Sequence, residues 1–467
     1  MQARELCQES VKQPAFLEDS RGVSTTLCGY YINNCYLQKE LNDIYVYRDY
    51  FFENHPMEMA RDKNKLIDDK MNALIEKLDE INGELPPLER CRFLLLKGKA
   101  YNLNTQYDAR ATLYLSKAIK LNPKLVDAWN ELGECYWKNR NIGDAKHSFE
   151  GGLKFERSKV ALRCLSIIRR QELIQNTGEA NLAVLQSVDF AKEAVSLDIK
   201  DGTSWCVLGN AYMCQFFLVS QEPNTLKSCM SAYRQAELDP VARGQPDLYY
   251  NKAMAAKYDE NYGESLVDFV RACDLDPYWD IVHEEKNKLI AYVNSVRELI
   301  RTKGKIKNKK LLLMVKSLDN KLLGPYAPPE SGQDAARISK AKLKKCLIDE
   351  LKVGVNEGKI VLGRVIGSIY TENVVPFTFG MIDSSNECIS VTVYNWADGR
   401  GVIIGDAVAI PEPMLRQHKF TFNDTVGEFE FKSIRVNNPT IMIVNGKQVD
   451  PSQFAGTRVT SSYDIAH

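Results

Sequence analysis

The sequence lacks an excess of charge of one sign and any hydrophobic run long enough to cross a bilayer. Its 467 residues include 61 basic and 61 acidic side chains, so no overall field draws the chain onto nucleic acid or a membrane surface. The longest apolar runs, such as residues 311–315, are far shorter than the roughly 20 residues of a membrane-spanning helix. Charges near the N-terminus also disfavour a secretory signal. We therefore predict no membrane partner, and any attraction to nucleic acid must be local.

Metal-binding and catalytic patterns are also missing. The twelve cysteines are scattered between Cys7 and Cys388 without a CxxC pair, which argues against a disulfide framework and a zinc site and predicts buried, reduced thiols. The five histidines are dispersed, and the sequence has neither a glycine-rich phosphate loop nor a nucleophile elbow. We predict a protein that is not an enzyme and holds no cofactor and no metal. We expect it in a reducing compartment, the cytoplasm, the nucleus or both.

What the sequence does contain is a helical repeat. One stretch places large and small side chains in a fixed order: Trp129, Leu132, Gly133, Tyr136, Ala145 and Phe149. This is the order of a tetratricopeptide (TPR) unit, in which large residues interlock two helices and small ones allow the helices to approach. Further copies, some incomplete, begin near Gly98, Leu162, Trp205 and Tyr249. Five or so units predict a right-handed α-solenoid over residues 88–300.

The segments around the repeats have other patterns. Residues 1–37 show no sustained period and are predicted to be a disordered leader. Residues 38–87 carry apolar side chains at three- and four-residue spacing, which is typical of capping helices. Residues 301–350 combine lysines, a loop rich in Pro, Gly and Ser and a short basic helix over 338–351, and we interpret them as a basic hinge and linker. Residues 451–467 are a C-terminal tail.

Residues 351–450 change to β-type alternation. Short β-branched segments separated by Gly, Asn and Asp turns predict strands over 359–370, 376–383, 388–394, 406–410, 419–422, 429–436 and 440–444. They suit a compact antiparallel barrel of the oligonucleotide/oligosaccharide-binding (OB) type. The predicted fold class is therefore a multidomain α + β protein, an α-solenoid of TPR hairpins followed by a small OB-type β-barrel. We expect the aromatic residues of the barrel to fill its interior rather than to stack on bases: Tyr370, Phe377, Phe379, Tyr394 and Trp396.

Binding is predicted on the concave face of the solenoid, which the first helix of each hairpin lines. The polar candidates there are Asn130, Glu134, Lys138, Asn210, Asp247 and Asn251. Amides can bond the backbone of an extended peptide, and a carboxylate can take an amine or a guanidinium. Arg169 or Arg170 could balance the negative charge. For any one of these residues, an ordinary solvated surface position is the alternative interpretation.

A local excess of positive charge follows the repeats. Residues 301–310 read RTKGKIKNKK and contain no acid: Arg301, Lys303, Lys305, Lys307, Lys309 and Lys310. A second run consists of Lys340, Lys342, Lys344 and Lys345. Ammonium groups in this number can contact the phosphates of structured RNA and release counterions. A solvated linker or a nuclear-import signal would have the same composition.

Several longer strings are more specific: AWNELGECYWK (128–138), SWCVLGNAYM (204–213), PDLYYNKA (246–253), KGKIKNKK (303–310), VPFTFG (375–380), IGDAVAIPEPMLR (404–416) and VNGK (444–447). Over about residues 40–450 the chain resembles the tetratricopeptide repeat protein 5 (Strap) family. The resemblance implies six TPR-like units, a C-terminal OB fold, and an adaptor that binds translating ribosomes near the exit tunnel. There it would recognise the N-terminal Met-Arg-Glu peptide of nascent α- and β-tubulin and trigger decay of tubulin mRNA.

The same resemblance implies a second role, which we keep as the alternative. In it the protein is a stress-responsive nuclear cofactor that bridges an acetyltransferase coactivator and a tumour-suppressor transcription factor. The implied partners are therefore the ribosome, nascent tubulin and mRNA decay factors, or else transcription coactivators.

The family's functional residues can be carried over onto this sequence. Its groove arginine and aspartate fall on Arg170 and Asp247, and we add Asn210 and Asn251 as peptide-binding candidates from the groove pattern. Its lysines that contact ribosomal RNA fall on Lys307 and Lys309, in a run that also includes Lys303 and Lys305. A Met-Arg-Glu terminus would offer cations to Asp247 and a carboxylate to Arg170. The adjacent Arg169 leaves the register between the two arginines open.

Overall fold

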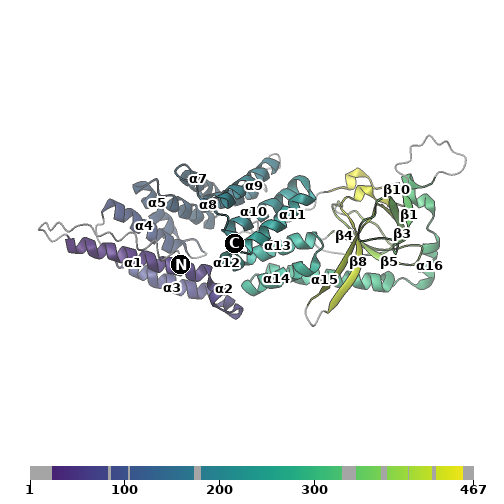
Figure 1. Ribbon diagram of the computed structural model, residues 1–467, viewed down its shortest axis with the longest axis horizontal. Helices are drawn as coiled ribbons and strands as arrows, with labels where there is room; N and C mark the ends of the chain where they lie inside the picture. The colour runs from purple at the N-terminus through teal and green to yellow at the C-terminus, as the bar shows by residue number, and fades with distance from the viewer. Residues whose placement is uncertain are drawn as a thin grey trace.

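The computed structural model describes residues 24–81, 86–103, 106–172, 180–328, 343–369, 376–397, 399–422 and 427–455. The molecule is elongated, with helices along most of its length and a β-domain at one end (Figure 1). In the described ranges no helix is both long and apolar enough to span a membrane. The cysteines with described side chains are free, and most are buried as the sequence predicts.

The repeats form five stacked hairpins within the described residues, fewer than the six units that the resemblance implies. Gly133 lies directly against the ring of Phe149, and Gly209 against that of Tyr233, where a Cβ would approach within 2.6 Å and 2.5 Å of the ring. Only glycine allows the two helices of a hairpin to come this close. The pairs are α4 Pro87–Asn102 with α5 Ala109–Leu121, α6 Val126–Lys138 with α7 Ile142–Leu153, α8 Lys159–Glu172 with α9 Ala180–Leu197, α10 Gly202–Gln215 with α11 Pro223–Ala236, and α13 Pro246–Tyr258 with α14 Tyr262–Leu275.

Short elements connect the later hairpins, and a long helix follows them. A single turn of π-helix, η2 Phe216–Ser220, extends α10, and α12 Pro240–Arg243 precedes α13. The chain then continues through α15 Asp280–Thr302, the turn η3 Lys303–Lys305, α16 Asn308–Lys316 and η4 Asn320–Tyr326. The confirmed solenoid is therefore extended by α15, which leads into the β-domain.

The N-terminal region differs from the predicted leader. Helix α1 Ser24–Asp49 begins inside the segment that we predicted to be disordered, because Leu37 and Leu41 are buried in a cluster with Leu74 and Leu78. The same cluster includes Leu96 and so joins this region to the first hairpin. The remaining elements are α2 Phe51–Asn54, η1 Met57–Arg61 and α3 Lys63–Asp79. Residues 1–23 lie outside the described residues.

The β-domain is one curled sheet of short strands. Its order is β10-β9-β6-β3-β4-β5-β8-β7-β2, with β1 paired to β3. Most pairs are antiparallel as expected, but β1–β3 and β5–β8 are parallel. The strands are β1 Lys344–Cys346, β2 Gly354–Val355, β3 Lys359–Ile369, β4 Phe377–Ile382, β5 Cys388–Val393, β6 Ala407–Pro411, β7 Met414–Thr421, β8 Glu428–Val436, β9 Ile443–Val444 and β10 Lys447–Gln448, with 3-10 turns η5 Pro439–Ile441 and η6 Pro451–Gln453.

Three sequence predictions for this domain need correction. The basic helix over 338–351 is wrong where it is described, because residues 344–346 form strand β1, whose Cys346 is buried in the barrel core. Residues 329–342, with Lys340 and Lys342, lie outside the described part. Strand β7 begins five residues before the predicted start at 419. In the segment 440–444, the first two residues belong to the η5 turn, and only the last two are strand.

Phe379 is buried in the barrel core as predicted, and Phe377 and Trp396 pack against that core. The prediction is wrong for Tyr394, which is buried against Tyr258 in the interface with the repeats. Tyr370 lies outside the described residues. Phe379 and Tyr394 are therefore closed to bases, whereas Phe377 and Trp396 are half-buried.

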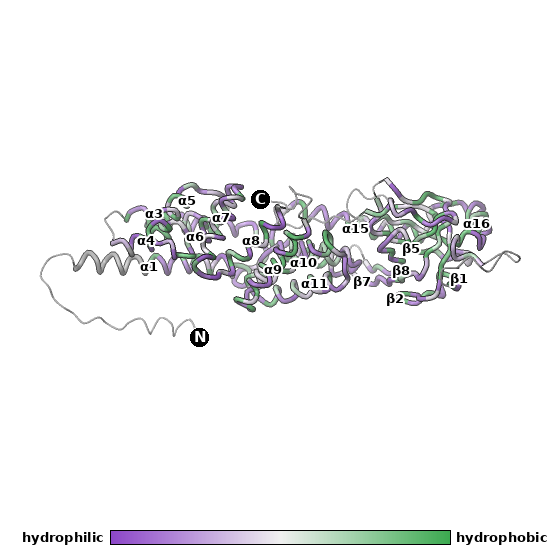
Figure 2. The backbone as a smooth tube through the Cα atoms, turned by 90° about the horizontal axis from the view of Figure 1, so that it is seen from above, coloured by the Kyte–Doolittle hydropathy of each residue, from purple (hydrophilic) through white to green (hydrophobic). Residues whose placement is uncertain are grey.

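The predicted basic hinge is wrong, because the β-domain is docked on the last repeats. Tyr292 on α15 shares a hydrogen bond of 2.9 Å with Thr378 on β4, and Leu299 lies over Gly367 and Gly380. One buried cluster joins α10–α15 to four aromatic residues of the barrel, Tyr394, Phe422, Phe429 and Phe431. In Figure 2 hydrophobic segments occur in both the helices and the sheet, which lie next to each other. The junction is a packed interface.

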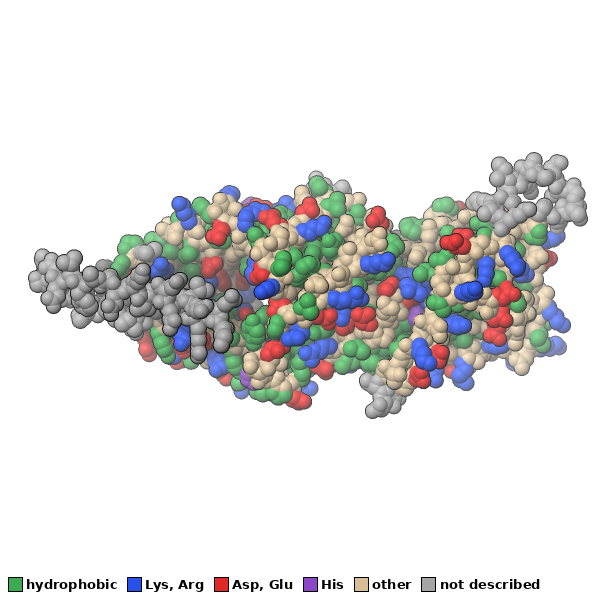
Figure 3. Space-filling view, in the orientation of Figure 1, with side chains coloured by type: hydrophobic (Ala, Val, Ile, Leu, Met, Phe, Trp, Pro, Cys, Tyr) green, Lys and Arg blue, Asp and Glu red, His purple; other side chains and the backbone are tan. Residues whose placement is uncertain are grey.

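Charges are mixed over the face seen in Figure 3. Blue and red side chains alternate along both domains without gathering into a surface of one sign. This arrangement agrees with the zero net charge, and it means that charged sites have to be sought in particular clusters.

Candidate functional site

The candidate groove is built from the first helices of three successive hairpins. Arg170 lies near the end of α8, Asn210 on α10, and Asp247 and Asn251 on α13. Burial raises the pKa of the Cys206 thiol, the Asp247 carboxylate raises it further, and the Arg170 guanidinium lowers it. Both charges therefore lie close to Cys206. Of the two adjacent arginines, Arg170 is the one whose charge acts at this point.

Three of the four groove candidates are buried. Arg170 is 2% exposed, and Asn210 and Asn251 are 0% exposed. The Nη1 of Arg170 donates to the hydroxyls of Ser166 at 3.0 Å and Ser187 at 3.1 Å. The interpretation of these three positions as solvated surface is therefore excluded. Asp247 is half-buried, so among the four it is the one that a guest can reach directly.

Two asparagines on the first helices keep an amide atom without a hydrogen-bond partner in the described part of the chain. Asn210 accepts a bond of 2.7 Å from the hydroxyl of Tyr233, and its Nδ2 has no partner. Asn130, on α6, donates to the hydroxyl of Ser158 at 2.9 Å, and its Oδ1 has no partner. Each buried, unpaired amide atom costs about 1–3 kcal/mol. Both atoms are buried, so neither is open to a guest in this conformation.

The N-terminal helices reach across the inner side of the solenoid. Burial and the carboxylate of Glu131 raise the pKa of Tyr45 on α1, which places Tyr45 against α6. Farther along, Glu53 on α2 pairs with Arg243 on α12 at 3.0 Å, and Phe52 lies beside Gly244. These helices therefore bridge from α6 to α12 and narrow the groove.

Sequence reasoning missed this bridge. The signal was present in the aromatic residues Tyr47 and Phe51, one turn apart in the predicted capping helices. Such a pair needs an apolar partner surface.

The contact between α1 and α6 includes the carboxyl group of Glu131, whose pKa is raised. Burial, and then repulsion from Glu134, raises the pKa of Glu131 from 4.5 to about 7, although Asn102 donates to its carboxylate at 2.7 Å. Because the folded protein holds this proton more tightly than the unfolded chain, the contribution of Glu131 to stability is fully present below pH 4.5 and is lost as the pH rises through about 7.

Glu131→Gln should remove this loss of stability. The variant should match the wild type near pH 4.5 and exceed it by about 1–3 kcal/mol above pH 7, because the amide cannot ionise. Urea unfolding at both pH values measures the difference. Glu76→Gln, at an exposed position on α3, is the control and should show no such change. Equal stability of the Glu131 variant and the wild type at high pH would contradict the prediction.

The lysines after α15 lie on a fixed turn. Lys303, Gly304 and Lys305 all have left-handed φ angles of 49°, 66° and 57°, and the Nζ of Lys303 donates to the carbonyl of Asn386 at 2.9 Å. Lys305, Lys307 and Lys309 are exposed. None of the three pairs with an acid of the described residues. We call residues 303–310 the lysine turn.

The comparisons with known proteins agree with this architecture. The family model of the tetratricopeptide repeat protein 5 OB fold domain matches residues 342–458. Tetratricopeptide repeat protein 5 of Bos taurus is 39% identical over 426 residues, which cover 91% of this chain and 96% of the bovine protein. The human protein has the same identity and coverage, and the mouse protein is 40% identical.

The chain belongs to the tetratricopeptide repeat protein 5 family. The predicted family and fold class are thus confirmed, and its TPR and OB-fold architecture is that of an adaptor. Such proteins are typically non-catalytic scaffolds. Among solved structures, the TPR protein YrrB aligns with a TM-score of 0.30 and 20% identity, over 46% of this chain and 97% of its own.

Family membership also places the OB domain boundary earlier than predicted. The match begins at residue 342, which brings β1 into the domain, whereas the sequence pattern placed the start at 351. In the described residues no group of three or more His, Cys, Asp or Glu side chains could hold a metal ion.

Proposed function

We propose that this family member is a ribosome-associated adaptor that captures the N-terminal peptide of nascent α- and β-tubulin and triggers decay of tubulin mRNA. The observation that carries the proposal is the pair of opposite charges, Asp247 and Arg170, at Cys206 in the groove. A peptide that begins Met-Arg-Glu has an amine and a guanidinium for the carboxylate and a carboxylate for the guanidinium. Charge-assisted bonds of this kind are among the strongest that a peptide can make.

The proposal assigns the two charges different positions relative to the guest. Asp247 is half-buried and can meet the cationic end of the peptide at the surface of the groove. Arg170 is held below by Ser166 and Ser187, so its charge attracts the glutamate from a fixed position. A guest with the opposite order of charges would be repelled at both ends.

The lysine turn supplies the second contact of the proposal. Lys305, Lys307 and Lys309 are exposed on one short segment, and several cations on a fixed backbone suit the phosphates of a folded RNA better than a flexible tail does. In this proposal the protein acts in the cytoplasm, and mRNA decay factors are its downstream partners.

Asp247→Asn should abolish most of the crosslinking between the protein and a nascent tubulin chain on ribosomes. Each lost charge-assisted contact costs about 1.5–3 kcal/mol, and the amide keeps the size of the side chain. Photocrosslinking from the first residues of the nascent chain measures the effect. Asp189→Asn on α9, an exposed carboxylate away from the groove, should crosslink as the wild type does. Undiminished crosslinking of the Asp247 variant would remove the peptide-binding role.

Reversing Lys307 and Lys309 to glutamate should weaken co-sedimentation with ribosomes by about tenfold or more and reduce its salt dependence, because phosphate contacts are lost. The matched control reverses Lys352 and Lys447, which are exposed elsewhere on the β-domain. If all three proteins sediment alike, the ribosome contact is elsewhere, and the nuclear-cofactor alternative becomes the role to test.

A further inference from the structure

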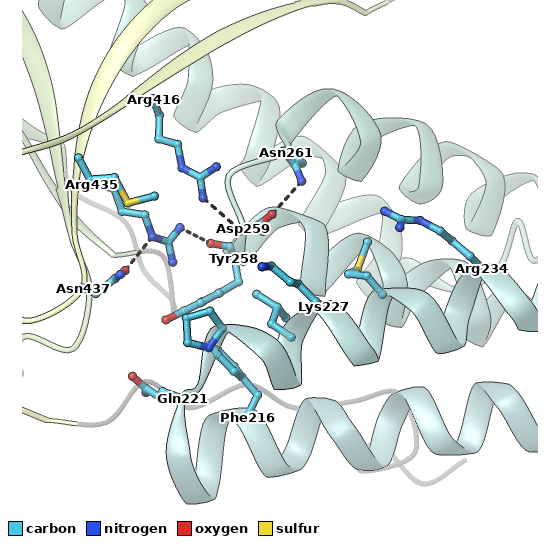
Figure 4. Close-up of a pocket in the computed structure, with 14 residues that line it drawn as sticks. Phe216, Gln221, Lys227, Arg234, Tyr258, Asp259, Asn261, Arg416, Arg435 and Asn437 are labelled. Atoms are coloured by element: carbon cyan, nitrogen blue, oxygen red, sulfur yellow. Dashed lines mark hydrogen bonds and ion pairs between the residues drawn. The ribbon is translucent and has the colours of Figure 1, made fainter. Parts of the chain in front are cut away.

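A second charged site lies between the two domains, away from the groove. A cleft of about 470 Å³ opens between α11, the end of α13 and strands β7 and β8. Figure 4 shows Lys227 and Arg234 entering it from the helical side and Arg416 and Arg435 from the side of the sheet. The cleft is as large as many small-ligand sites.

Two of the four cations are already used to hold the domains together. Arg435 donates to the carbonyl of Tyr258 at 2.7 Å and to Asn437 at 2.7 Å, and it pairs with the buried Glu260 at 3.4 Å. Arg416 pairs with Asp259 at 3.2 Å. The Nε of Arg416 is nevertheless buried without a hydrogen-bond partner in the described part of the chain.

The other two cations carry the surplus charge. Lys227 and Arg234 are exposed on α11, and neither pairs with a carboxylate of the described residues. With Glu260 counted against Arg435 and Asp259 against Arg416, the net charge of the cleft is +2, four cations minus two acids. The site is therefore suited to an anion.

The walls between these charges are apolar. Leu226, Met230 and Met414 line the cleft together with Phe216. Methionine side chains adapt to guests of different shape. A simple inorganic anion would leave this surface unused, so the complementary ligand has an apolar body between negative groups.

The spacing of the cations sets the form of the ligand. Lys227 and Arg234 are seven residues apart on one helix, which corresponds to about 10 Å along its axis. Successive side chains of an extended peptide point to opposite faces, so two carboxylates that share a face with one side chain between them are four residues apart. They are separated by about 13 Å, which the long, flexible side chains of Lys227 and Arg234 can span. We propose that this cleft binds an extended acidic peptide that places an aromatic or aliphatic side chain against the methionines, between two carboxylates that meet Lys227 and Arg234.

Nucleic acid fits the cleft less well. Binding of single strands needs aromatic faces on which bases stack. The aromatic residues of the lining are already packed: Phe216 lies edge-to-face with Phe217 and Tyr258, and Arg435 lies over the ring of Tyr258. The site is therefore a peptide site, distinct from the concave groove.

The test uses the full chain and fluorescein-labelled decapeptides of Gly and Ser that contain Glu-Ala-Phe-Ala-Glu, in which both Glu side chains and the Phe share one face of the extended peptide. Fluorescence anisotropy should show saturable binding that weakens with salt. A peptide with Gln in place of both Glu, and the variant Lys227→Glu/Arg234→Glu, should each bind about tenfold more weakly or worse. Because both residues are exposed, the variant should fold, which circular dichroism verifies. Lys117→Glu/Lys124→Glu, at exposed positions on α5 and in the turn after it, and Asp247→Asn should bind as the wild type does.

Three results would overturn the proposal. The first is the absence of saturable binding of the acidic peptide. The second is equal binding by the Lys227→Glu/Arg234→Glu variant, which would place the peptide elsewhere. The third is displacement of the peptide by an oligouridylate that itself binds more tightly and loses affinity in the same variant, which would make the cleft a nucleic-acid site.

Discussion

Gly304→Ala should lower the free energy of unfolding by about 2–5 kcal/mol, although it adds a single methyl group. Gly304 has a φ of 66°, and a Cβ there would lie 2.1 Å from the carbonyl oxygen of Ile366 on β3. The left-handed conformation costs an L-residue about 1–2 kcal/mol. The contact with a backbone oxygen, which cannot rotate away, adds about 1–3 kcal/mol.

Gly358→Ala is the matched control, because Gly358 has nearly the same φ, 69°, but no neighbouring atom within 4 Å in the described structure. It should lose only the conformational part of the stability, about 1–2 kcal/mol. Urea unfolding of both variants isolates the contact as the difference between them. Equal losses of stability in the two variants would mean that a Cβ at position 304 has no costly contact with β3. Since Gly304→Ala leaves every lysine in place, reduced ribosome binding by this variant would show that the position of the lysines matters as well as their charge.

Glu260→Gln should destabilise the protein by about 3–5 kcal/mol, because it leaves the guanidinium of Arg435 buried without its counter-charge. The two residues are 3% and 7% exposed, and the guanidinium stacks over the ring of Tyr394 at 3.9 Å. Glutamine keeps an acceptor for the hydroxyl of Tyr394, which donates to Glu260 at 3.1 Å. The loss of stability in this variant therefore measures the effect of removing the negative charge.

The control for the buried ion pair is an ion pair on the protein surface. Arg301 and Glu298 on α15 pair at 2.7 Å with side chains 69% and 44% exposed, so Arg301→Gln should cost well under about 1 kcal/mol. Urea unfolding followed by tryptophan fluorescence and by limited proteolysis measures both variants. Proteolysis of Glu260→Gln between the repeats and the barrel would indicate that the domains have separated. A variant as stable as Arg301→Gln would contradict the role given to the pair.

The sequence predicted those parts of the fold that depend on local patterns. The hairpin around Trp129 follows from residue types within one repeat, and strands such as β8 follow from alternation within one segment. The helix predicted near residue 344 failed because its side chains resemble a basic helix, whereas the segment pairs with β3 and buries Cys346. The hinge failed for a related reason. Its lysines suggested a segment exposed to solvent, but Ile306, Leu311 and Met314 pack the same segment against the barrel.

For the candidate site, the pattern identified the helices but not the accessibility of their side chains. Asn210 and Asn251 occupy non-core positions of a repeat, where a polar residue is normally solvated, and both are fully buried. Whether such a position is open depends on the neighbouring repeats. The Glu260–Arg435 pair was also invisible in the sequence, because its members are 175 residues apart and belong to different domains.

The docking of α15 on the barrel sets the distance between the groove and the lysine turn. The helix has 23 residues and spans about 35 Å, and its packed contacts fix the separation between the groove and the lysine turn. If the lysine turn rests on the ribosome as proposed, Asp247 is held at one distance from the ribosomal surface. Capture would then begin at a defined length of emerged chain, so the protein would measure how far synthesis has advanced as well as read which peptide is being made.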